Sequence, residues 1–427
     1  MTIIVFTFSL LGAMALGMPI AFALLVCGVA MMFQLDMFDA QIIAQNTING
    51  ADSFPLMAIP FFMLAGTLMN AGGLSKRIIN FAFALVGHIR GGLGYVCIIA
   101  SAILASLSGS AAADAAAMAA MLFPMMIQAG HDKKRSAGLI ACGGIIGPMV
   151  PPSSGLILFG VTAGLSITKL FLAAIVPGLL IAISLAVAWW WVARNESVQP
   201  QPKKSAREIF AAFREGIWAL MMPAIIIFGL KFGVFTPTEA GVVCAVYALL
   251  VAKYVYKELQ WRDLYGVVVQ AGMTTAVVMF LVAAALVSAW LIAVADLPSQ
   301  VAAALSPFMG SPTLMMIMVM LLVVIIGTAL DMTPTILILT PVLVPVIKQA
   351  GIDPIYFGVL FIINNAIGLV TPPVGTTLNV VCGVARVTMD DIIVGVLPFM
   401  AAQLAVLALL VAFPQIVLAP LRLMTGG

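Results

Sequence analysis

Apolar residues follow one another in long segments along the chain, and short polar stretches separate these segments. Runs of roughly 20 apolar residues recur from one end to the other, which is the length a helix needs to cross a hydrocarbon core of about 30 Å. We expect a first span over 3–33 and a second over 54–73, with an acidic loop that holds Asp36, Asp39 and Asp52 between them. The pattern predicts an all-α polytopic membrane protein.

Composition supports the same class. Hydrophobic residues make up 63% of the 427 positions and charged residues only 8%, whereas soluble domains carry about 25% charged residues. The chain therefore has too few charges to cover a water-exposed surface. Its five cysteines are scattered in apolar surroundings without metal or redox spacing, so we interpret them as small hydrophobic residues.

An internal repeat divides the chain into two halves. The segment PMMIQAGHD begins at Pro124, and PVIKQAGID begins at Pro345, 221 positions later. The same offset carries Pro151-Pro152 onto Pro372-Pro373. The seam between the halves lies in the polar stretch 194–216. Such self-similarity indicates two related structural units.

The distribution of basic residues gives the direction of each half. In the first half the loops at 88–92 and 131–135 are basic, whereas in their counterparts 221 residues later only Lys348 is positive. Short basic loops stay in the cytoplasm, so the two halves are expected to cross the membrane in opposite senses. This inverted-topology repeat is typical of secondary transporters. His88 and His131 lie beside the basic loops and are expected at the membrane interface.

Each half contains a predicted re-entrant hairpin. The segment 77–90 is short and basic at both ends, so we place it in the membrane interface. The following stretch, 92–130, starts and ends at basic loops on one side and has the turn sequence SLSGS at 106–110 in its middle. Its counterpart is 313–350, with GTALDMTP at its tip. Both stretches are therefore predicted to enter the membrane and turn back.

A proline-interrupted span follows each hairpin. GPMVPPSSG occupies 147–155, and NNAIGLVTPPVGTTLN ends at Asn379. Proline removes a backbone donor, and unwound backbone at membrane depth is tolerated only where protein or a polar cavity satisfies it. A corresponding pair of such breaks in inverted halves points to a transport site. Freed carbonyls and hydroxyls suit Na⁺, and freed amides at helix N-termini suit an anion. A simple proline kink is the structural alternative.

Several polar residues in apolar surroundings are candidates for function. Asp331 and Asp114 are predicted to act in gating or coupling, or as cation ligands, because a charge at mid-bilayer is costly; Asp114 could instead cap a helix. Asn364 and Asn365 precede the second break and either bond its carbonyls or contact substrate. Arg386 either anchors a cytoplasmic loop or pairs with a substrate carboxylate.

Five segments together resemble the large membrane (M) subunit of tripartite ATP-independent periplasmic (TRAP) transporters, the DctM-like family. They are LGMPIAFAL, FPLMAIPFFMLAG, SGSAAADAAAMA, GPMVPPSSG and TPPVGTTLNV, and the resemblance extends over essentially the whole chain. It implies an elevator-type ion-transporter fold in the bacterial inner membrane, with a scaffold and a mobile transport domain. It also implies a small four-helix membrane subunit and a periplasmic substrate-binding protein as partners. Transport would be coupled to Na⁺, without an organic cofactor, for organic acids such as C4-dicarboxylates, sugar acids and sialic acids.

The resemblance and the repeat together predict the domain boundaries. The first inverted repeat is 1–195, the cytoplasmic linker is 196–216, and the second repeat is 217–427. The scaffold helices are expected in 1–90 and 217–311, and the transport-domain hairpins and broken helices in 92–195 and 313–427.

The resemblance also implies site residues, grouped here by role. One Na⁺ site would be framed by Ser106, Ser108, Gly147, Val150 and Pro151. A second would be framed by Gly327, Thr328, Gly368, Thr371 and Thr376. The substrate would contact Ser153, Ser154, Gly155, Thr377 and Asn379, in addition to Asn364, Asn365 and Arg386.

Three other functions are weighed against this one. A stand-alone Na⁺/dicarboxylate symporter of related fold would share the hairpins but would need no binding protein. An intramembrane enzyme would need a nucleophile–base pair or a metal centre, and neither HExxH nor GxSxG occurs. A passive channel suits two inverted re-entrant halves less well than alternating access does. No residue separates the organic acids from one another, and overall similarity favours a sugar acid or sialic acid.

Overall fold

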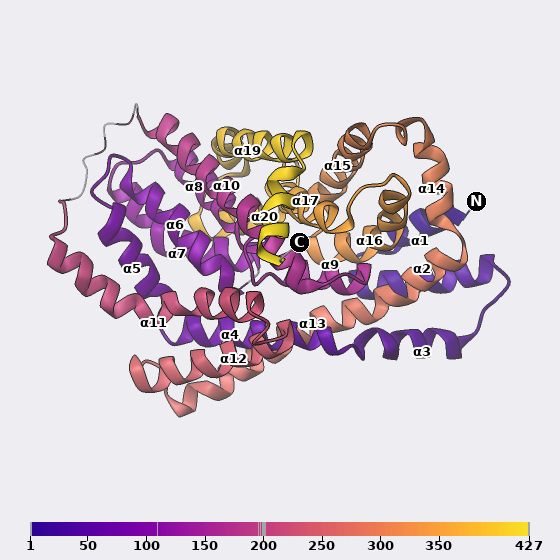
Figure 1. Cartoon of the computed structure of the whole chain (residues 1–427), viewed down its shortest axis with the longest axis horizontal. Coiled ribbons are helices and arrows are strands. Elements are labelled where there is room, and N and C mark those ends of the chain that lie inside the picture. The colour runs from indigo at the N-terminus through magenta and orange to yellow at the C-terminus, as the bar shows by residue number, and fades with distance from the viewer. Residues whose placement is uncertain (1, 109, 195, 197, 199–201, 426–427) are drawn as a thin grey trace.

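The computed structural model describes residues 2–108, 110–194, 196, 198 and 202–425, and all regular secondary structure in them is helical. Figure 1 shows the helices arranged along one long axis. The first half contains α1 (Thr2–Ala15), α2 (Ile20–Gln34), α3 (Ala40–Ala51), the 3₁₀ turn η1 (Phe54–Met57), α4 (Ala58–Ala71), α5 (Leu74–Val86), α6 (Gly92–Ser108), α7 (Ala111–Gln128), α8 (Lys133–Gly144), η2 (Gly147–Met149), α9 (Ser154–Ala163) and α10 (Ile167–Ala193).

The second half contains α11 (Ala206–Lys231), α12 (Pro237–Leu250), the π-helical turn η3 (Val251–Val255), α13 (Trp261–Val294), α14 (Leu297–Leu305), η4 (Ser306–Phe308), α15 (Pro312–Ala329), α16 (Met332–Gln349), α17 (Pro354–Gly368), α18 (Thr376–Ala385), α19 (Met389–Ala412) and α20 (Gln415–Thr425). From α14 onward the second half repeats the order of α5–α10, and it ends with one further helix, α20. The described residues thus confirm the all-α fold.

The predicted repeat is present residue by residue. Helix α7 begins at Ala111 and ends at Gln128, and α16 begins at Met332 and ends at Gln349, so both ends are shifted by 221 positions. The Pro151-Pro152 and Pro372-Pro373 peptide bonds, which the same offset relates, are both cis. The two halves are therefore copies of one helical unit.

The two predicted hairpins form and approach each other from opposite ends of the molecule. Helices α6 and α7 lie to the left in Figure 1, and α15 and α16 lie to the right. The arms contain 17 or 18 residues, which corresponds to about 26 Å of helix, close to the minimum that can cross a 30 Å hydrocarbon core. Because the tips point inward from opposite sides, the halves have inverted topology and the hairpins are re-entrant.

Both predicted helix breaks are also present. The segment that combines α8 and η2 is bent by 43° relative to α9, with 150–153 between them. In the second half, α17 ends at Gly368 and α18 begins at Thr376. The interruptions fall at the Gly/Pro-rich sequences because proline has no backbone N–H to donate to the hydrogen bonds of a helix.

The first predicted span, 3–33, is wrong as a single helix. The chain reverses between α1 and α2 at Gly17, which has a φ of +80°, and Pro19 precedes the first turn of α2. The two helices then pack side by side. The Gly-Met-Pro sequence at 17–19 is a turn signal that the surrounding apolar residues conceal.

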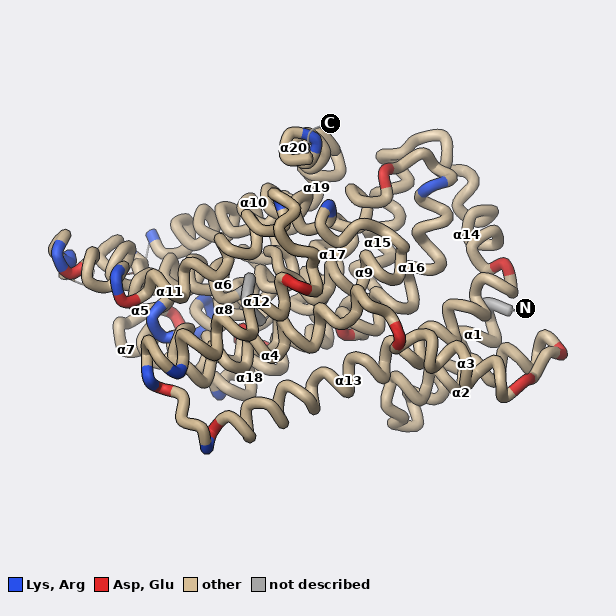
Figure 2. The backbone as a smooth tube through the Cα atoms, turned by 60° about the horizontal axis from the view of Figure 1, so that its bottom comes forward, with Lys and Arg blue, Asp and Glu red and all other residues tan. Residues whose placement is uncertain are grey.

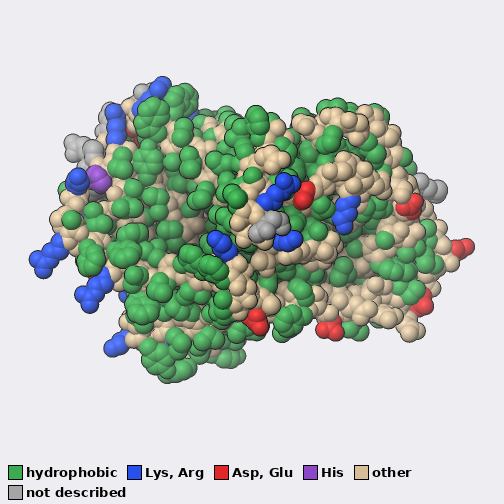
Figure 3. All heavy atoms as spheres, in the orientation of Figure 1, with side chains coloured by type: hydrophobic (Ala, Val, Ile, Leu, Met, Phe, Trp, Pro, Cys, Tyr) green, Lys and Arg blue, Asp and Glu red, His purple; other side chains and the backbone are tan. Residues whose placement is uncertain are grey.

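The surface of the molecule has an apolar part and charged ends. Nine helices in the described residues are long and apolar enough to cross a bilayer, and the bent α8–α9 pair gives a tenth if it is counted as one span. Hydrophobic side chains cover most of the face in Figure 3. Most Lys and Arg residues gather at the end that contains α5 and α11, and acidic residues lie beside α1–α3 and α14 (Figure 2). This polarity follows the positive-inside rule.

The two repeats interlock through pairs of helices that the symmetry exchanges. Helix α7 packs on α18 and α9 packs on α16, while α8 packs on α19. The last contact is a close backbone approach, because a Cβ atom at Gly395 would overlap the carbonyl of Lys134 and a Cβ atom at Gly138 would overlap the backbone of Gly395. Glycine is therefore required where α8 crosses α19.

We expect Gly395→Ala to lower the free energy of unfolding by about 1–3 kcal/mol, because the added methyl group meets backbone that cannot move aside. Gly272→Ala in α13 is the matched control, since nothing lies within 4 Å of its Cβ position and alanine favours a helix. Thermal unfolding in detergent measures both variants. A Gly395→Ala protein as stable as Gly272→Ala would contradict the close α8–α19 packing.

Candidate functional site

The tips of both hairpins and parts of both broken segments surround one cavity of about 190 Å³. Residues of the hairpins and breaks form one side of it, and residues of α4 and α13 form the other side. The lining residues are Ile59, Met63, Ser110, Ala111, Ala112, Ser154, Gly155, Leu158, Thr274, Val278, Asp331, Met332, Thr333 and Leu369. Residues that lie more than two hundred positions apart in the chain thus share one site.

Three helices begin at this cavity. The first turns of α7, α9 and α16 each contribute two lining residues, which are Ala111 and Ala112, Ser154 and Gly155, and Met332 and Thr333. The unpaired N–H groups of a helix N-terminus carry a partial positive charge. Three such termini around a small cavity favour an anion.

Asp331 is the acidic residue in this lining. It occupies the N-cap position of α16, but its side chain makes no capping hydrogen bond. Its carbonyl instead accepts a hydrogen bond of 2.9 Å from the Thr335 hydroxyl. The carboxylate therefore stands at the second hairpin tip, where its charge adds to the electrostatics of the cavity.

Of the three substrate residues predicted at the first break, two line the cavity and one does not. Ser153 is buried and its hydroxyl is occupied, because it donates to the Pro148 carbonyl and accepts from the Leu156 amide at 3.2 Å. Ser153 thus caps α9, whereas Ser154 and Gly155 line the cavity. A Cβ atom at Gly155 would lie only 2.7 Å from the Sδ atom of Met332, so the first break packs directly on the second hairpin tip.

The second break packs on its own hairpin through glycine. A Cβ atom at Gly368 would lie 2.8 Å from the backbone carbon of Gly327, so the ends of α15 and α17 are in backbone contact. The Gly375 amide donates to the Thr328 carbonyl at 3.4 Å, and the Thr377 amide donates to the Leu369 carbonyl at 3.1 Å. Gly327, Thr328 and Gly368, three of the residues predicted to frame a second cation site, are therefore brought together.

Three buried oxygen atoms in this region have no hydrogen-bond partner among the described residues. They are Asn365 Oδ1, Thr376 Oγ1 and Thr377 Oγ1. The amide of Asn365 donates to the Met332 carbonyl at 3.2 Å, which ties the second broken helix to the second hairpin tip. Buried polar atoms are normally paired, so three unpaired oxygens within residues 365–377 make this break a candidate for binding a cation.

Other predicted residues of this half have local roles. The hydroxyls of Thr328 and Thr371 each donate 2.7 Å hydrogen bonds to carbonyls of their preceding turns. Asn364 is buried and donates to the Met320 carbonyl at 2.6 Å, so it links α17 to α15. Asn379 is exposed and donates to the Val374 carbonyl at 3.1 Å.

Arg386 does not reach the cavity. It follows the last residue of α18, about 15 Å along the helix from Thr376, and its side chain is exposed. Its carbonyl accepts a hydrogen bond of 3.4 Å from Lys133 Nζ. This placement corresponds to the anchoring interpretation of Arg386.

The predicted first cation site is described only in part. Ser106 and Ser108 belong to the end of α6, and their side chains lie outside the described part of the structure. Gly147 and Pro151 are buried at the first break, and Val150 packs on α10, where a Cβ atom at Gly178 would lie 3.0 Å from it. Asp114 is buried in the first turn of α7 and does not line the cavity.

The scaffold side of the cavity is the part that the sequence did not reveal. Ile59 and Met63 on α4, with Thr274 and Val278 on α13, face the hairpin tips. Three of these side chains are apolar and cannot be told from lipid-facing residues by sequence. Thr274 is polar within an apolar helix and was the one available signal.

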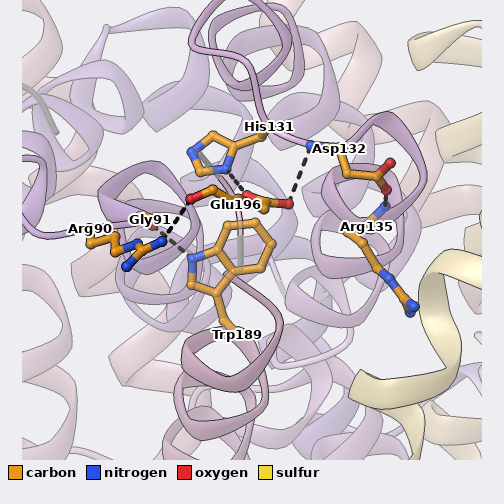
Figure 4. Close-up of polar contacts among 7 residues, drawn as sticks. All are labelled: Arg90, Gly91, His131, Asp132, Arg135, Trp189 and Glu196. Atoms are coloured by element: carbon orange, nitrogen blue, oxygen red, sulfur yellow. Dashed lines mark hydrogen bonds and ion pairs between the residues drawn. The ribbon is translucent and has the colours of Figure 1, made fainter. Parts of the chain in front are cut away.

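A separate polar cluster lies at the basic end of the molecule (Figure 4). His131, which we expected at the membrane interface, is buried within the protein, and its Nδ1 atom lies 2.6 Å from Glu196 Oε2. Arg90 donates to the Glu196 carbonyl at 3.0 Å, and the Trp189 indole donates to the Gly91 carbonyl at 2.7 Å. These contacts hold Glu196, at the start of the predicted linker, against the first half.

Sequence and structure comparisons agree with this architecture. Residues 7–416 match the family described as "Tripartite ATP-independent periplasmic transporter, DctM component". The 2,3-diketo-L-gulonate TRAP transporter large permease protein YiaN of Escherichia coli (strain K12) is 54% identical over 422 residues, which cover 99% of each chain. The sialic acid TRAP transporter large permease protein SiaM of Vibrio cholerae is 39% identical over 411 residues and 96% of each chain.

A solved structure shares the fold. The YdaH transporter of Alcanivorax borkumensis superposes with a TM-score of 0.65 over 90% of this chain and 91% of its own, at 17% sequence identity. At that identity the likeness concerns the fold alone. The family match and the relatives, in contrast, cover nearly the whole sequence. The chain therefore belongs to the DctM family of TRAP large permeases, multi-pass secondary transporters of organic acids in the bacterial inner membrane.

Proposed function

We propose that this chain is the Na⁺-coupled permease for uptake of a sugar acid, which it binds in the cavity between the two hairpin tips. The observation that supports this proposal is the convergence of three helix N-termini, both hairpin tips and both breaks around one small space. Inverted repeats with broken helices place substrate and coupling ions at such a point in other secondary transporters.

The helix N-termini would bind the carboxylate of the substrate. The first-turn amides of α7, α9 and α16 point their partial positive charge at the cavity, and a carboxylate accepts hydrogen bonds from such groups. The side chains of Ser110, Ser154, Thr274 and Thr333, which line the cavity, would then contact the hydroxyl groups of a sugar acid. This division uses the main chain for charge and the side chains for orientation.

The coupling cation would occupy the oxygen-rich environment at the second break. Asn365 Oδ1, Thr376 Oγ1 and Thr377 Oγ1 lack partners there, and hard cations prefer oxygen ligands. Unwound carbonyls of such breaks coordinate Na⁺ in other transporters. By the 221-residue symmetry, a first cation would lie near Gly147 and the end of α6, and Asp114 beside this site would take part in coupling.

Asp331 would couple the two ligands. Its carboxylate lines the cavity, so an anionic substrate that approaches it is repelled unless a cation is bound nearby. Binding of Na⁺ at the second break would remove this repulsion. The substrate would consequently bind well only together with the ion.

Similarity to two named relatives supports the proposed class of substrate. The E. coli permease that is 54% identical is named for 2,3-diketo-L-gulonate, and the V. cholerae permease that is 39% identical is named for sialic acid. Both are sugar-derived acids, so we propose this class over the C4-dicarboxylates.

Transport would follow an elevator mechanism. The hairpins and broken helices pack on one another and would move as a transport domain (92–195 and 313–427), while α4 pairs with α12 and α5 with α11 in a scaffold (1–90 and 217–311). The residues 196–216 would link the repeats in the cytoplasm. A small four-helix membrane subunit would support the scaffold, and a periplasmic binding protein would deliver the acid.

Uptake into proteoliposomes tests the coupling. With the small subunit and the binding protein present, we expect an inward Na⁺ gradient to drive concentrative uptake of 2,3-diketo-L-gulonate, and an equal K⁺ gradient to drive none. Omitting the binding protein should abolish transport. Uptake that persists in Na⁺-free buffer would contradict the ion assignment, and uptake without the binding protein would indicate a stand-alone symporter.

Thr377→Val removes one of the three unpaired oxygens and keeps the volume of the side chain. We expect the Na⁺ concentration for half-maximal uptake to rise about tenfold, because one ligand is lost. Thr162→Val in α9 is the control, since its hydroxyl bonds the Leu158 carbonyl at 2.8 Å within the helix. Equal Na⁺ dependence in the two variants would refute the proposed cation site.

Ser153→Ala separates a capping role from a substrate role. Because the Ser153 hydroxyl caps α9, we expect the free energy of unfolding to fall by about 1–2 kcal/mol, with an unchanged substrate concentration for half-maximal uptake. Calorimetry and uptake assays on the same preparation measure both quantities. A protein of wild-type stability that needs far more substrate would show that Ser153 binds the acid after all.

A further inference from the structure

A second cavity lies far from the hairpin tips, where α5 and α11 meet the end of η3. It has a volume of about 730 Å³ and is lined by Arg77, Arg207, Phe210, Ala211, Arg214, Glu215, Trp218, Val255 and Tyr256. None of the residues predicted for transport lies in it. Its basic residues belong to the positively charged end of the molecule in Figure 2.

Two arginines of this cavity have no acidic partner. Arg207 and Arg214 are seven residues apart on α11, so they lie two turns apart on the same face, about 10 Å from each other along the helix. Both are exposed, and within the described ranges neither forms a salt bridge. Glu215 is the one carboxylate in the lining, so the cavity has an excess of positive charge.

Arg77 is held in place on the opposite wall. Its guanidinium lies 2.7 Å from Glu258 Oε1 and 3.8 Å from the centre of the Tyr256 ring. The Tyr256 hydroxyl in turn donates to the Glu215 carbonyl at 2.7 Å, which joins this wall to α11. The cavity therefore has a fixed shape on one side and two free guanidinium groups on the other.

Polarity changes along α11 in the direction of the membrane. The same face carries Arg207 and Arg214 first and Trp218 one turn later, with Phe210 between the arginines. Phe210 is 65% exposed and Trp218 is 41% exposed, and few residues of α11 are buried in the protein. Arginine at the aqueous end and aromatic rings toward the hydrocarbon are typical of a membrane interface.

We propose that this cavity binds the headgroup of an anionic phospholipid from the cytoplasmic leaflet. Guanidinium groups bind phosphate oxygens through paired hydrogen bonds, and basic pockets between helices on the cytoplasmic side suit such headgroups. The acyl chains of the lipid would continue along Trp218 and the exposed apolar face of α11. A soluble phosphate would use the arginines but would leave this apolar face without a function.

Native mass spectrometry of the full-length protein in detergent tests the proposal, with phosphatidylglycerol as the probe and phosphatidylethanolamine as the neutral comparison. The double variant R207Q/R214Q should raise the dissociation constant for phosphatidylglycerol about ten- to thirtyfold. The control R422Q, which removes an exposed arginine of α20, should leave it unchanged. Phosphatidylethanolamine should bind weakly to all three proteins.

A second variant, R207K/R214K, keeps the charges but loses the paired hydrogen bonds, so an intermediate, several-fold weakening is expected. Size-exclusion chromatography shows whether R207Q/R214Q folds. If it does not fold, R207K/R214K tests the proposal in its place. Equal affinity of phosphatidylglycerol for the wild type and the folded double variants would overturn the proposal. Competition by millimolar inorganic phosphate would also overturn it, because it would identify a site for a soluble anion.

Discussion

Backbone groups at membrane depth have no water to bond, and this constraint governs the architecture around the two Pro-Pro breaks. A transporter that exposes main-chain N–H and C=O groups to a ligand must satisfy the remaining ones with protein. At the second break the Gly375 and Thr377 amides bond the carbonyls of Thr328 and Leu369, and at the first break Ser153 bonds both Pro148 and Leu156. The groups left over include the first-turn amides beside the cavity and the unpaired oxygens of Asn365, Thr376 and Thr377.

Glycine makes this arrangement possible. The break and the hairpin of the second half touch through Gly327 and Gly368, and the first break touches the second hairpin at Gly155. Close approach in the second half accompanies hydrogen bonds between the break and the hairpin, such as that from the Asn365 amide to the Met332 carbonyl. The inverted symmetry then brings two hairpin tips to one point, so that a single cavity is lined by both halves and by the helices α4 and α13.

The sequence predicted the features that depend on local chemistry. Proline and glycine located both breaks, and the register of 221 residues found in the sequence relates the observed ends of α7 to those of α16. Prediction from the sequence failed where contacts between residues far apart in the chain determine the structure. The turn at Gly17 was hidden within apolar residues, and the burial of His131 depends on Glu196 and Trp189, which lie far away in the chain. The capping role of Ser153 and the exposed position of Arg386 are likewise set by where their helices begin and end.

The most direct measurement is an experimental structure of the transporter with Na⁺ and 2,3-diketo-L-gulonate bound. The account predicts density for the carboxylate of the acid between the first turns of α7, α9 and α16, within hydrogen-bond distance of the amides of 111–112, 154–155 and 332–333. It also predicts a cation beside Asn365, Thr376 and Thr377. An acid bound elsewhere, with the space between the hairpin tips filled by side chains, would contradict the account.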